Sequence, residues 1–433
     1  MSRTALPPLI APPECNLAAR DVEGLLDELR AYHAHFSPLF ARREQRDWGW
    51  QYLQGLLSDL PRESIEPMAL ALPEGNVRAM QQFIGEGAWD DPAILAAHQR
   101  LVAETLGESD GVLIVDGSDF PKKGTASVGV ARQYCGALGK VANCQAGIFL
   151  AYASRKGYTL LDHRLYLPQD WFTPASRPRR RRCGVPAAVA FRTASTLAWD
   201  MITAVHAAGV LPIGWVTFDE GFGQNPGFLA SLEAAGLRYL AEVPCLTRVW
   251  RRPPAIVQPP GSGRGRPRKY AGVAVGTPHP QRVDAFARRL SPAAWREYAI
   301  KDGAKGVIRA AFAFVRIHPV RNRVPGPESW LVLRRTRDKR PELKYYLSNA
   351  PATTPPGPLV WLSGLRWPVE RAFQECKGEL GMDHYETRTW RGWHHHQTLT
   401  ILAHHFLVRL RLRLKKTIMA KLASASVRAN HGC

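Results

Sequence analysis

The sequence predicts a mixed α/β sheet with helices on its faces, preceded by a helical segment. Short apolar runs of β-rich composition begin at residue 112 and then alternate with helical stretches, which is typical of such a sheet. Before them, residues 17–106 place apolar side chains such as Val22, Leu25 and Leu29 at helical spacing. Helical periodicity returns after residue 361, so we expect helices at both ends of the sheet-forming region.

The elements of the sheet are expected in a definite order. Strand-like runs come first, at residues 112–115, 145–152 and 158–167. Alternating helices and strands follow, at 193–208 (helix), 213–218 (strand), 225–235 (helix) and 238–243 (strand). Beyond the Pro-, Gly- and Arg-rich segment 251–268, a β-rich insertion is predicted by runs at 307–317, 330–333 and 343–347.

The charge of the chain predicts a polyanionic partner. Lys and Arg number 58 against 37 Asp and Glu, which gives a formal net charge of +21. A charge of this size makes a compact fold repel itself, and nucleic acid is the first candidate for the polyanion that offsets it. The 45% hydrophobic and 9% aromatic content is enough for a buried core, which argues against a mostly disordered chain.

Nothing in the sequence favours a membrane partner or a disulfide scaffold. No stretch approaches the ~20 uninterrupted apolar residues of a spanning helix. The N-terminus lacks the apolar region of a signal peptide. The 7 cysteines are odd in number and form no C-x-x-C pair, which indicates reduced thiols. We therefore expect a cytoplasmic protein without a membrane partner.

A length of 433 residues exceeds what one core usually supports, so several regions are expected. Arg42, Arg43 and Arg46 make the N-terminal helical region a candidate DNA-binding domain, with a solvated basic helix face as the alternative. The expected regions are a flexible N-terminus (1–14), the helical domain (15–108), the first part of the α/β core (109–245), the β-rich insertion with a basic loop (246–355), the C-terminal helical part of the core (356–415) and a basic tail (416–433).

Two aspartates stand where strands of the sheet are expected to end. Asp116 directly follows the apolar run 112–115, and Asp219 follows the run 213–218. Ligands and metals bind at the carboxyl ends of strands in open α/β sheets, so the two side chains can converge there. Asp is also common in turns, but the repeated setting favours the paired interpretation.

Each aspartate has an acidic neighbour that is an alternative. Asp119 lies three residues after Asp116, which we prefer because it directly ends the expected strand. Glu220 adjoins Asp219, but adjacent residues of an extended segment point in opposite directions, so only one of them can face the site.

Helix geometry selects a third acid from the segment that follows the insertion. At ~100° per residue, Lys377 lies about 20° around the helix from Glu370, so the two share a face. Glu375 is rotated by about 140° and Glu379 by about 180°, and neither can share that face. Glu386 is the remaining candidate, and a surface helix with alternating charges is the alternative interpretation of the segment.

Three carboxylates in a basic chain suit phosphodiester chemistry. Two hard cations held about 3.5–4 Å apart by oxygen ligands can activate an attacking water or 3′-hydroxyl and stabilise the leaving oxygen. Mg²⁺ prefers carboxylates and retained waters, so three acids suffice. We therefore expect Asp116, Asp219 and Glu370 to be catalytic and to hold two Mg²⁺ ions, for which Mn²⁺ can substitute.

These residues resemble those of the DDE transposases of bacterial insertion sequences. In one large group the last acid lies in a Y-x(2)-R-x(3)-E-x(6)-K signature, and Arg366, Glu370 and Lys377 match its R, E and K. Ser363 stands at the tyrosine position, so the hairpin route associated with that region is not implied here. Residues 115–136, 215–223 and 391–394 resemble the two aspartate blocks and the segment after the glutamate, and the likeness spans roughly residues 20 to 415.

The resemblance implies an RNase H-like mixed sheet with flanking helices and a β-rich insertion before the last catalytic acid. It also implies a transposase that binds double-stranded DNA, both element ends and target, and that cleaves and joins strands with Mg²⁺. Such an enzyme would be associated with the nucleoid in the bacterial cytoplasm and act as a homodimer in its DNA complex. The alternatives are a non-catalytic DNA-binding relic or repressor and a metal-dependent nuclease without transposition.

Basic residues are expected to contact DNA at several places. Arg366 and Lys377 accompany the last acid, and Lys122, Lys123 and Arg132 follow the first, where they could hold phosphates or form a solvated loop.

Two arginine-rich segments add further candidates. The run 177–182, expected on a loop, would add salt-dependent affinity or simply be solvated. Arg264 and Arg266 form an Arg-Gly-Arg-Pro stretch that resembles a minor-groove hook, with general backbone contact as the alternative.

Overall fold

The computed structural model of the protein describes residues 24–257, 271–303, 306–338 and 340–430. The predicted flexible segment 1–14 and the predicted minor-groove residues Arg264 and Arg266 lie outside the described residues. None of the helices in the described segments is both long and apolar enough to cross a membrane.

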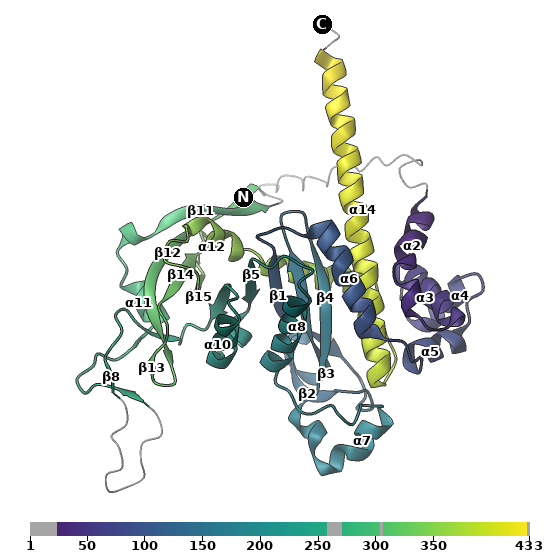
Figure 1. Cartoon of the computed structure of the whole chain (residues 1–433), viewed down its shortest axis with the longest axis horizontal. Coiled ribbons are helices and arrows are strands. Elements are labelled where there is room, and N and C mark those ends of the chain that lie inside the picture. Colours follow the sequence, from purple (N-terminus) through teal and green to yellow (C-terminus); the bar gives the residue numbers. More distant parts are fainter. Residues whose placement is uncertain (1–23, 258–270, 304–305, 339, 431–433) are drawn as a thin grey trace, which may run out of the picture.

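The N-terminal region is helical, as predicted, and packs against the last helix of the chain (Figure 1). Its helices are α2 (Leu25–Ala34), α3 (Arg43–Leu56), α4 (Ile65–Ala71), α5 (Val77–Gly85) and α6 (Asp91–Leu106). Asn76 and Asp90 accept hydrogen bonds from the third backbone N–H of α5 and α6, which explains why these helices begin there. The last helix, α14 (Trp390–Asn430), contacts α3, α5 and α6.

The centre of the molecule is a mixed sheet, which confirms the predicted α/β fold class. Its first strands are β1 (Val112–Pro121), β2 (Ala131–Cys135), β3 (Lys140–Ala153), β4 (Tyr158–Tyr166), β5 (Trp215–Phe218) and β6 (Tyr239–Val243). β1 is parallel to β5 and β5 is parallel to β6, whereas β3 is antiparallel to β1, β2 and β4.

The β-rich insertion extends this sheet instead of forming one of its own. β15 pairs with β6, β14 pairs with β15, and β12 pairs with β14, all antiparallel. The insertion comprises β7 (Arg248–Trp250), β10 (Gln281–Arg282), α11 (Val283–Arg288), β11 (Arg296–Gly303), β12 (Gly306–Arg321), β13 (Val324–Pro325), β14 (Ser329–Arg335) and β15 (Leu343–Ser348). A separate two-stranded sheet joins β8 (Ile256–Val257) to β9 (Gly272–Val273).

Helices cover both faces of the sheet, because alternate residues of a strand point to opposite sides. On β1, Val112 and Ile114 join the apolar cluster that includes α13 (Arg366–Glu379) and α14. Leu113 and Val115 join the cluster on the other face, with α8 (Ala194–Ala208) and α10 (Pro226–Ala234). The remaining helices are α7 (Arg177–Arg182), α9 (Glu220–Gly223) and α12 (Pro356–Leu362).

Three sequence expectations need correction. β1 continues to Pro121, because residues 116–121 keep pairing with β3, so Asp116 does not end the strand. The run 177–182 is a short helix, α7, not a loop; Pro178 in its first turn favours that start, and Arg179 lies 3.9 Å over the ring of Trp171. The final helical segment, predicted from residue 361, begins with α12 at residue 356 and comprises three helices, the last of which extends to residue 430.

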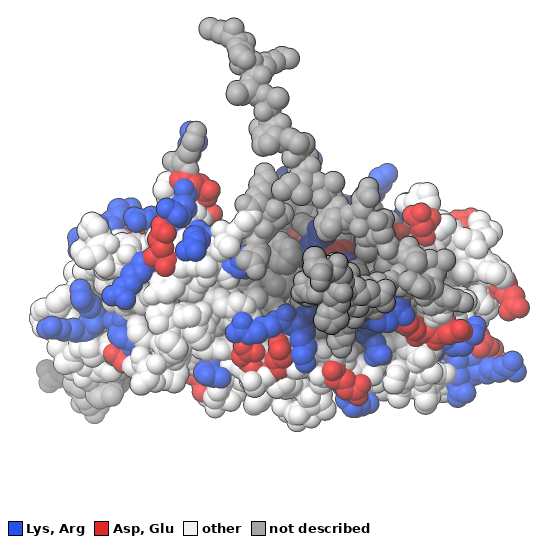
Figure 2. All heavy atoms as spheres, turned by 90° about the horizontal axis from the view of Figure 1, so that it is seen from above, with Lys and Arg blue, Asp and Glu red and all other residues white. Residues whose placement is uncertain are grey.

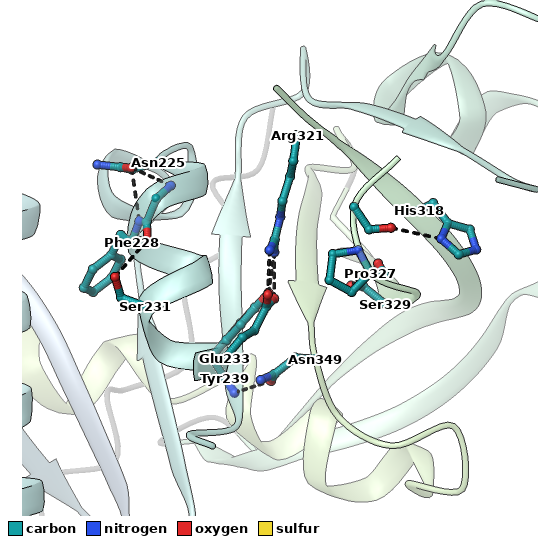
Figure 3. A network of polar contacts seen from close by, with 12 residues as sticks. Asn225, Phe228, Ser231, Glu233, Tyr239, His318, Arg321, Pro327, Ser329 and Asn349 are labelled. Carbon is teal, nitrogen blue, oxygen red and sulfur yellow. Dashed lines mark hydrogen bonds and ion pairs between the residues drawn. The ribbon is translucent and has the colours of Figure 1, made fainter. Parts of the chain in front are cut away.

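A buried ion pair ties the insertion to the core (Figure 3). Arg321, at the end of β12, contacts both carboxylate oxygens of Glu233 in α10, at 2.5 and 2.7 Å. Tyr239 at the start of β6 donates to the same carboxylate at 2.7 Å. Asn349 accepts from the backbone N–H of Tyr239 and donates to the carbonyl of Leu237, which holds the end of β15 to the start of β6. Because the Arg321 and Glu233 side chains are 11% and 19% exposed, this pair is shielded from solvent.

We expect Arg321→Met to loosen the insertion, because it leaves the Glu233 carboxylate without its cation. Removing one partner of such a pair costs about 3 kcal/mol. Hydrogen–deuterium exchange in increasing urea should show α10, β12 and β13 opening at lower denaturant than in the wild type. The double variant Arg321→Met/Glu233→Leu should recover much of the loss, and Arg43→Met, which removes the exposed pair with Asp47, should change little. Unchanged exchange in Arg321→Met would show that the pair does not hold the insertion.

Candidate active site

The parallel strands bring three acidic residues into one row. Val115 of β1 pairs with Phe218 of β5, and Phe218 pairs in turn with residue 241 of β6. The next residue along each strand is therefore at the same level, and neighbouring strands lie only about 4.8 Å apart. These next residues are Asp116, Asp219 and Glu242.

The three acidic side chains also share a face of the sheet. Two residues before them, Ile114, Thr217 and Leu240 are paired across the three strands, and Ile114 and Leu240 belong to the cluster on the α13 side. Because side chains repeat every two residues, the acids point to the same side. Asp119 has the opposite parity from Asp116, and its carboxylate accepts the backbone N–H of Gly136 at 2.6 Å. The structure thus gives Asp119 a role in the adjoining turn.

The turn after Asp219 is shaped by close packing against β6. Asp219 caps α9 by accepting the backbone N–H of Phe222 at 3.3 Å. At the end of that turn, a Cβ on Gly223 would lie 1.9 Å from the carbonyl oxygen of Glu242, so only glycine fits. This contact keeps the end of β5 close to the middle of β6. The exposed Glu220 is on the surface of the same turn.

Helix α13 carries Glu370 and Arg366 onto the row of acids. Arg366 Nη2 lies 3.3 Å from Glu370 Oε1 and 4.0 Å from Asp116 Oδ2. Arg366 Nη1 lies 3.3 Å from Glu242 Oε2, and Lys344 Nζ of β15 lies 3.0 Å from Glu242 Oε1. The structure therefore places Asp116, Glu370 and Glu242 around one guanidinium group.

The other candidate glutamates face elsewhere. Glu375 is buried and contacts Tyr158, His404 and Arg411, so it joins α13 to β4 and α14. Glu386 forms an ion pair with Arg62 at 2.9 Å on the surface, and Glu379 is exposed. In the part of the chain that the structure describes, no hydrogen bond or ion pair joins any of these three glutamates to Asp116, Asp219 or Glu242.

Burial and the neighbouring charges change the pKa values of Asp116 and Arg366. Burial raises the pKa of Asp116 to about 7; Arg366 opposes this shift, and the nearby Asp219 and Glu370 add to it. Burial by itself would lower the pKa of Arg366, but four surrounding carboxylates outweigh that effect and raise it. These carboxylates belong to Asp116, Glu242, Asp219 and Glu370.

The acids are gathered around a cation that belongs to the protein. Within the described residues, no three His, Cys, Asp or Glu side chains lie close enough together to hold a metal ion. Arg366 Nη2 contacts both Asp116 and Glu370, so the guanidinium partly neutralises these two carboxylates. The donor set of carboxylate oxygens fits a hard divalent cation, but the spacing fits the guanidinium.

Four of the basic residues that are predicted to contact DNA divide into two groups, engaged and exposed. Lys377 donates to the carbonyl of Asp119 at 3.0 Å, and burial lowers its pKa. Lys122 lies 3.6 Å over the ring of Tyr385, and burial lowers its pKa to about 8. Lys123 and Arg132 are exposed. The last two are therefore the more accessible to an external phosphate.

Two residues of the site, Glu242 and Lys344, are absent from the sequence prediction. The available signal was the single charged residue inside the strand 239–243, since a buried carboxylate needs a partner. The partners Lys344 and Arg366 are 102 and 124 residues away, so the signal did not identify them.

The sequence is similar to those of known proteins. Residues 35–307, more than half of the chain, match the family described as DDE superfamily endonuclease. A protein of Microchaete diplosiphon named "Probable transposase for insertion sequence element IS701" is 25% identical over 197 residues. That match covers 45% of this chain and 48% of the relative, so the chain spans about half the length of the curated relative it matches. The mixed sheet with flanking helices is the RNase H-like fold expected from the resemblance, and the family match shows that this chain belongs to the DDE superfamily endonucleases.

Proposed function

We propose that this protein is a transposase that cuts and joins DNA strands with divalent metal ions held by Asp116, Asp219 and Glu370. The observation that carries the proposal is the row of acids on neighbouring parallel strands, with Glu370 brought to it by α13. The name of the matched relative supports transposition. The family match includes Asp116 and Asp219 and ends before Glu370, so the role of Glu370 rests on geometry and on the signature spacing.

The chemistry divides between the metal and the chain. Two Mg²⁺ ions, when bound, would activate the attacking water or 3′-hydroxyl and stabilise the leaving oxygen. Asp116, Asp219 and Glu370 would be their protein ligands, and Asp116 must lose its proton to serve. Arg366 presents several N–H donors beside these acids, a geometry suited to a phosphate oxygen.

The partner is proposed to be double-stranded DNA, at the element ends and at the target. Lys and Arg side chains gather over the insertion on the face shown in Figure 2, where the grey atoms leave it visible. The exposed arginines of the insertion include Arg296, Arg309, Arg335, Arg337 and Arg340. Such cations bind the phosphate backbone without reading sequence. Two copies of the chain would hold the two element ends together, in the cytoplasm of the bacterial cell.

Two other functions predict different results. A nuclease of the same chemistry would cleave but not join strands. A DNA-binding relic or repressor would bind the element ends without metal-dependent cutting. The presence of Asp116, Asp219 and Glu370 around Arg366 supports an active enzyme over a relic.

We expect the protein to cleave a plasmid that carries the DNA flanking its gene, in Mg²⁺ or Mn²⁺ and not in EDTA. Asp116→Asn, Asp219→Asn and Glu370→Gln should each reduce cleavage by about a thousandfold or more, because each removes a charged ligand. Gel analysis of end-labelled product measures cleavage, and a precut end mixed with target plasmid measures strand transfer.

Exposed acids close to the site serve as matched controls. Glu220 lies next to Asp219, and Glu379 lies on α13 about 180° from Glu370. The control variants are Glu220→Gln and Glu379→Gln. Both should keep cleavage within about twofold of the wild type. Asp116, Asp219 and Glu370 form the proposed triad of metal ligands. Full cleavage by a variant of any one of them would refute the ligand role of that residue. Cleavage without strand transfer would identify a nuclease.

The raised pKa of Asp116 predicts how stability depends on pH without metal. Its carboxyl titrates near 4 in the unfolded chain and at about 7 in the fold, so the wild type loses stability as pH rises between these values. Asp116→Asn cannot ionise. In EDTA its free energy of unfolding should therefore rise relative to the wild type from pH 5 to 7, by up to about 1.4 kcal/mol per pH unit. Urea unfolding at several pH values measures the difference.

A neutral substitution on the same strand gives the baseline for that experiment. Ile114→Val removes no titratable group, so its effect on the free energy of unfolding should be the same at each pH. A constant difference between Asp116→Asn and the wild type across this range would show that Asp116 is already ionised at pH 5.

A further inference from the structure

Glu242 is the buried acid of the site that the proposed metal ligands do not include. Its residue exposure is 8%, and β5 and β15 flank its strand on both sides. Each of its carboxylate oxygens has its own cation, Lys344 on Oε1 and Arg366 on Oε2. Because both of its carboxylate oxygens contact cations of the protein, Glu242 binds Lys344 and Arg366 instead of an added ion.

Arg366 is shared between Glu242 and the proposed metal ligands. Its Nη1 contacts Glu242, while its Nη2 lies between Glu370 and Asp116. Asp116 and Glu370, which would help to hold a divalent ion, already have carboxylate oxygens in contact with Nη2 of Arg366. The guanidinium of Arg366 would therefore compete with a metal ion for the carboxylates of the triad. Glu242 in turn competes with these carboxylates for the guanidinium.

We propose that Glu242 is a positioning residue that holds Arg366 at the edge of the site, so that Asp116, Asp219 and Glu370 can take divalent ions. The inference rests on the proposed function for the identity of those ligands. Lys344 supports it by contacting the other carboxylate oxygen of Glu242, so that the buried acid has a cationic partner on each oxygen. Held in this way, Arg366 stays beside the metal ligands, in reach of the phosphate.

The test is direct binding of Mn²⁺ to the full chain without DNA, measured by electron paramagnetic resonance. Glu242→Gln keeps the size of the side chain but loses its charge, so Arg366 should shift toward the triad and weaken Mn²⁺ binding by about tenfold. The double variant Glu242→Gln/Arg366→Gln has no guanidinium left to compete, and it should bind Mn²⁺ at least as tightly as the wild type. Cleavage should remain low in the double variant, because the phosphate partner is gone.

Glu233→Gln is the matched control for simple structural damage. Glu233 is also a shielded glutamate that holds an arginine, but it lies in α10 and pairs with Arg321. Its substitution should reduce stability and leave Mn²⁺ affinity unchanged.

The outcomes separate the inference from the proposed function. Wild-type Mn²⁺ affinity in Glu242→Gln, or a weakened affinity that Arg366→Gln does not restore, would overturn the role of Glu242. A wild type that binds no Mn²⁺, or an Asp116→Asn variant that binds as well as the wild type, would instead refute the triad as metal ligands.

Discussion

The mutual repulsion of four carboxylates is the constraint on which the rest of the site depends. Asp116, Asp219, Glu242 and Glu370 surround Arg366 in a partly buried space, where like charges interact more strongly than in water. Burial is the main cause of the raised pKa of Asp116; Asp219 and Glu370 add to the shift, and Arg366 opposes it. Carboxylates that the protein neutralises only in part attract added cations, which suits the divalent ions proposed for this site.

The sheet supplies the geometry that this electrostatic arrangement requires. Parallel pairing of β1, β5 and β6 aligns three acids at one level, and the glycine at 223 lets the turn after β5 pack on β6. The insertion contributes as well, because β15 extends the sheet next to β6 and carries Lys344 to Glu242. The clamp between Arg321 and Glu233 joins β12, two strands away from β15, to α10 and contributes no side chain to the site.

The sequence predicts the local parts of this structure better than the long-range ones. Strand composition and helical periodicity located most elements, and rotation about the helix axis separated Glu370 from the buried Glu375. The extension of β1 past Asp116 was missed because a polar run with glycine resembles a turn until its partner β3 is known. Lys122 and Lys377 were expected to meet phosphates, yet tertiary contacts with Tyr385 and Asp119 engage them. Glu242 was also missed because of long-range contacts: its role depends on the neighbouring strands and on partners far away in the sequence.

The same charges govern how DNA can approach the site. Four carboxylates oppose the phosphate backbone, and Arg366, Lys344 and Lys301, which is near Glu370, offset them in part. Attraction must then come from exposed cations away from the acids, such as Lys123, Arg132 and the arginines of the insertion. Bound metal ions would make the electrostatic potential positive at the carboxylates and leave the rest of the surface unchanged. Binding by the periphery and cutting at the centre would thus be separate events, with Arg366 the group whose interactions change between them.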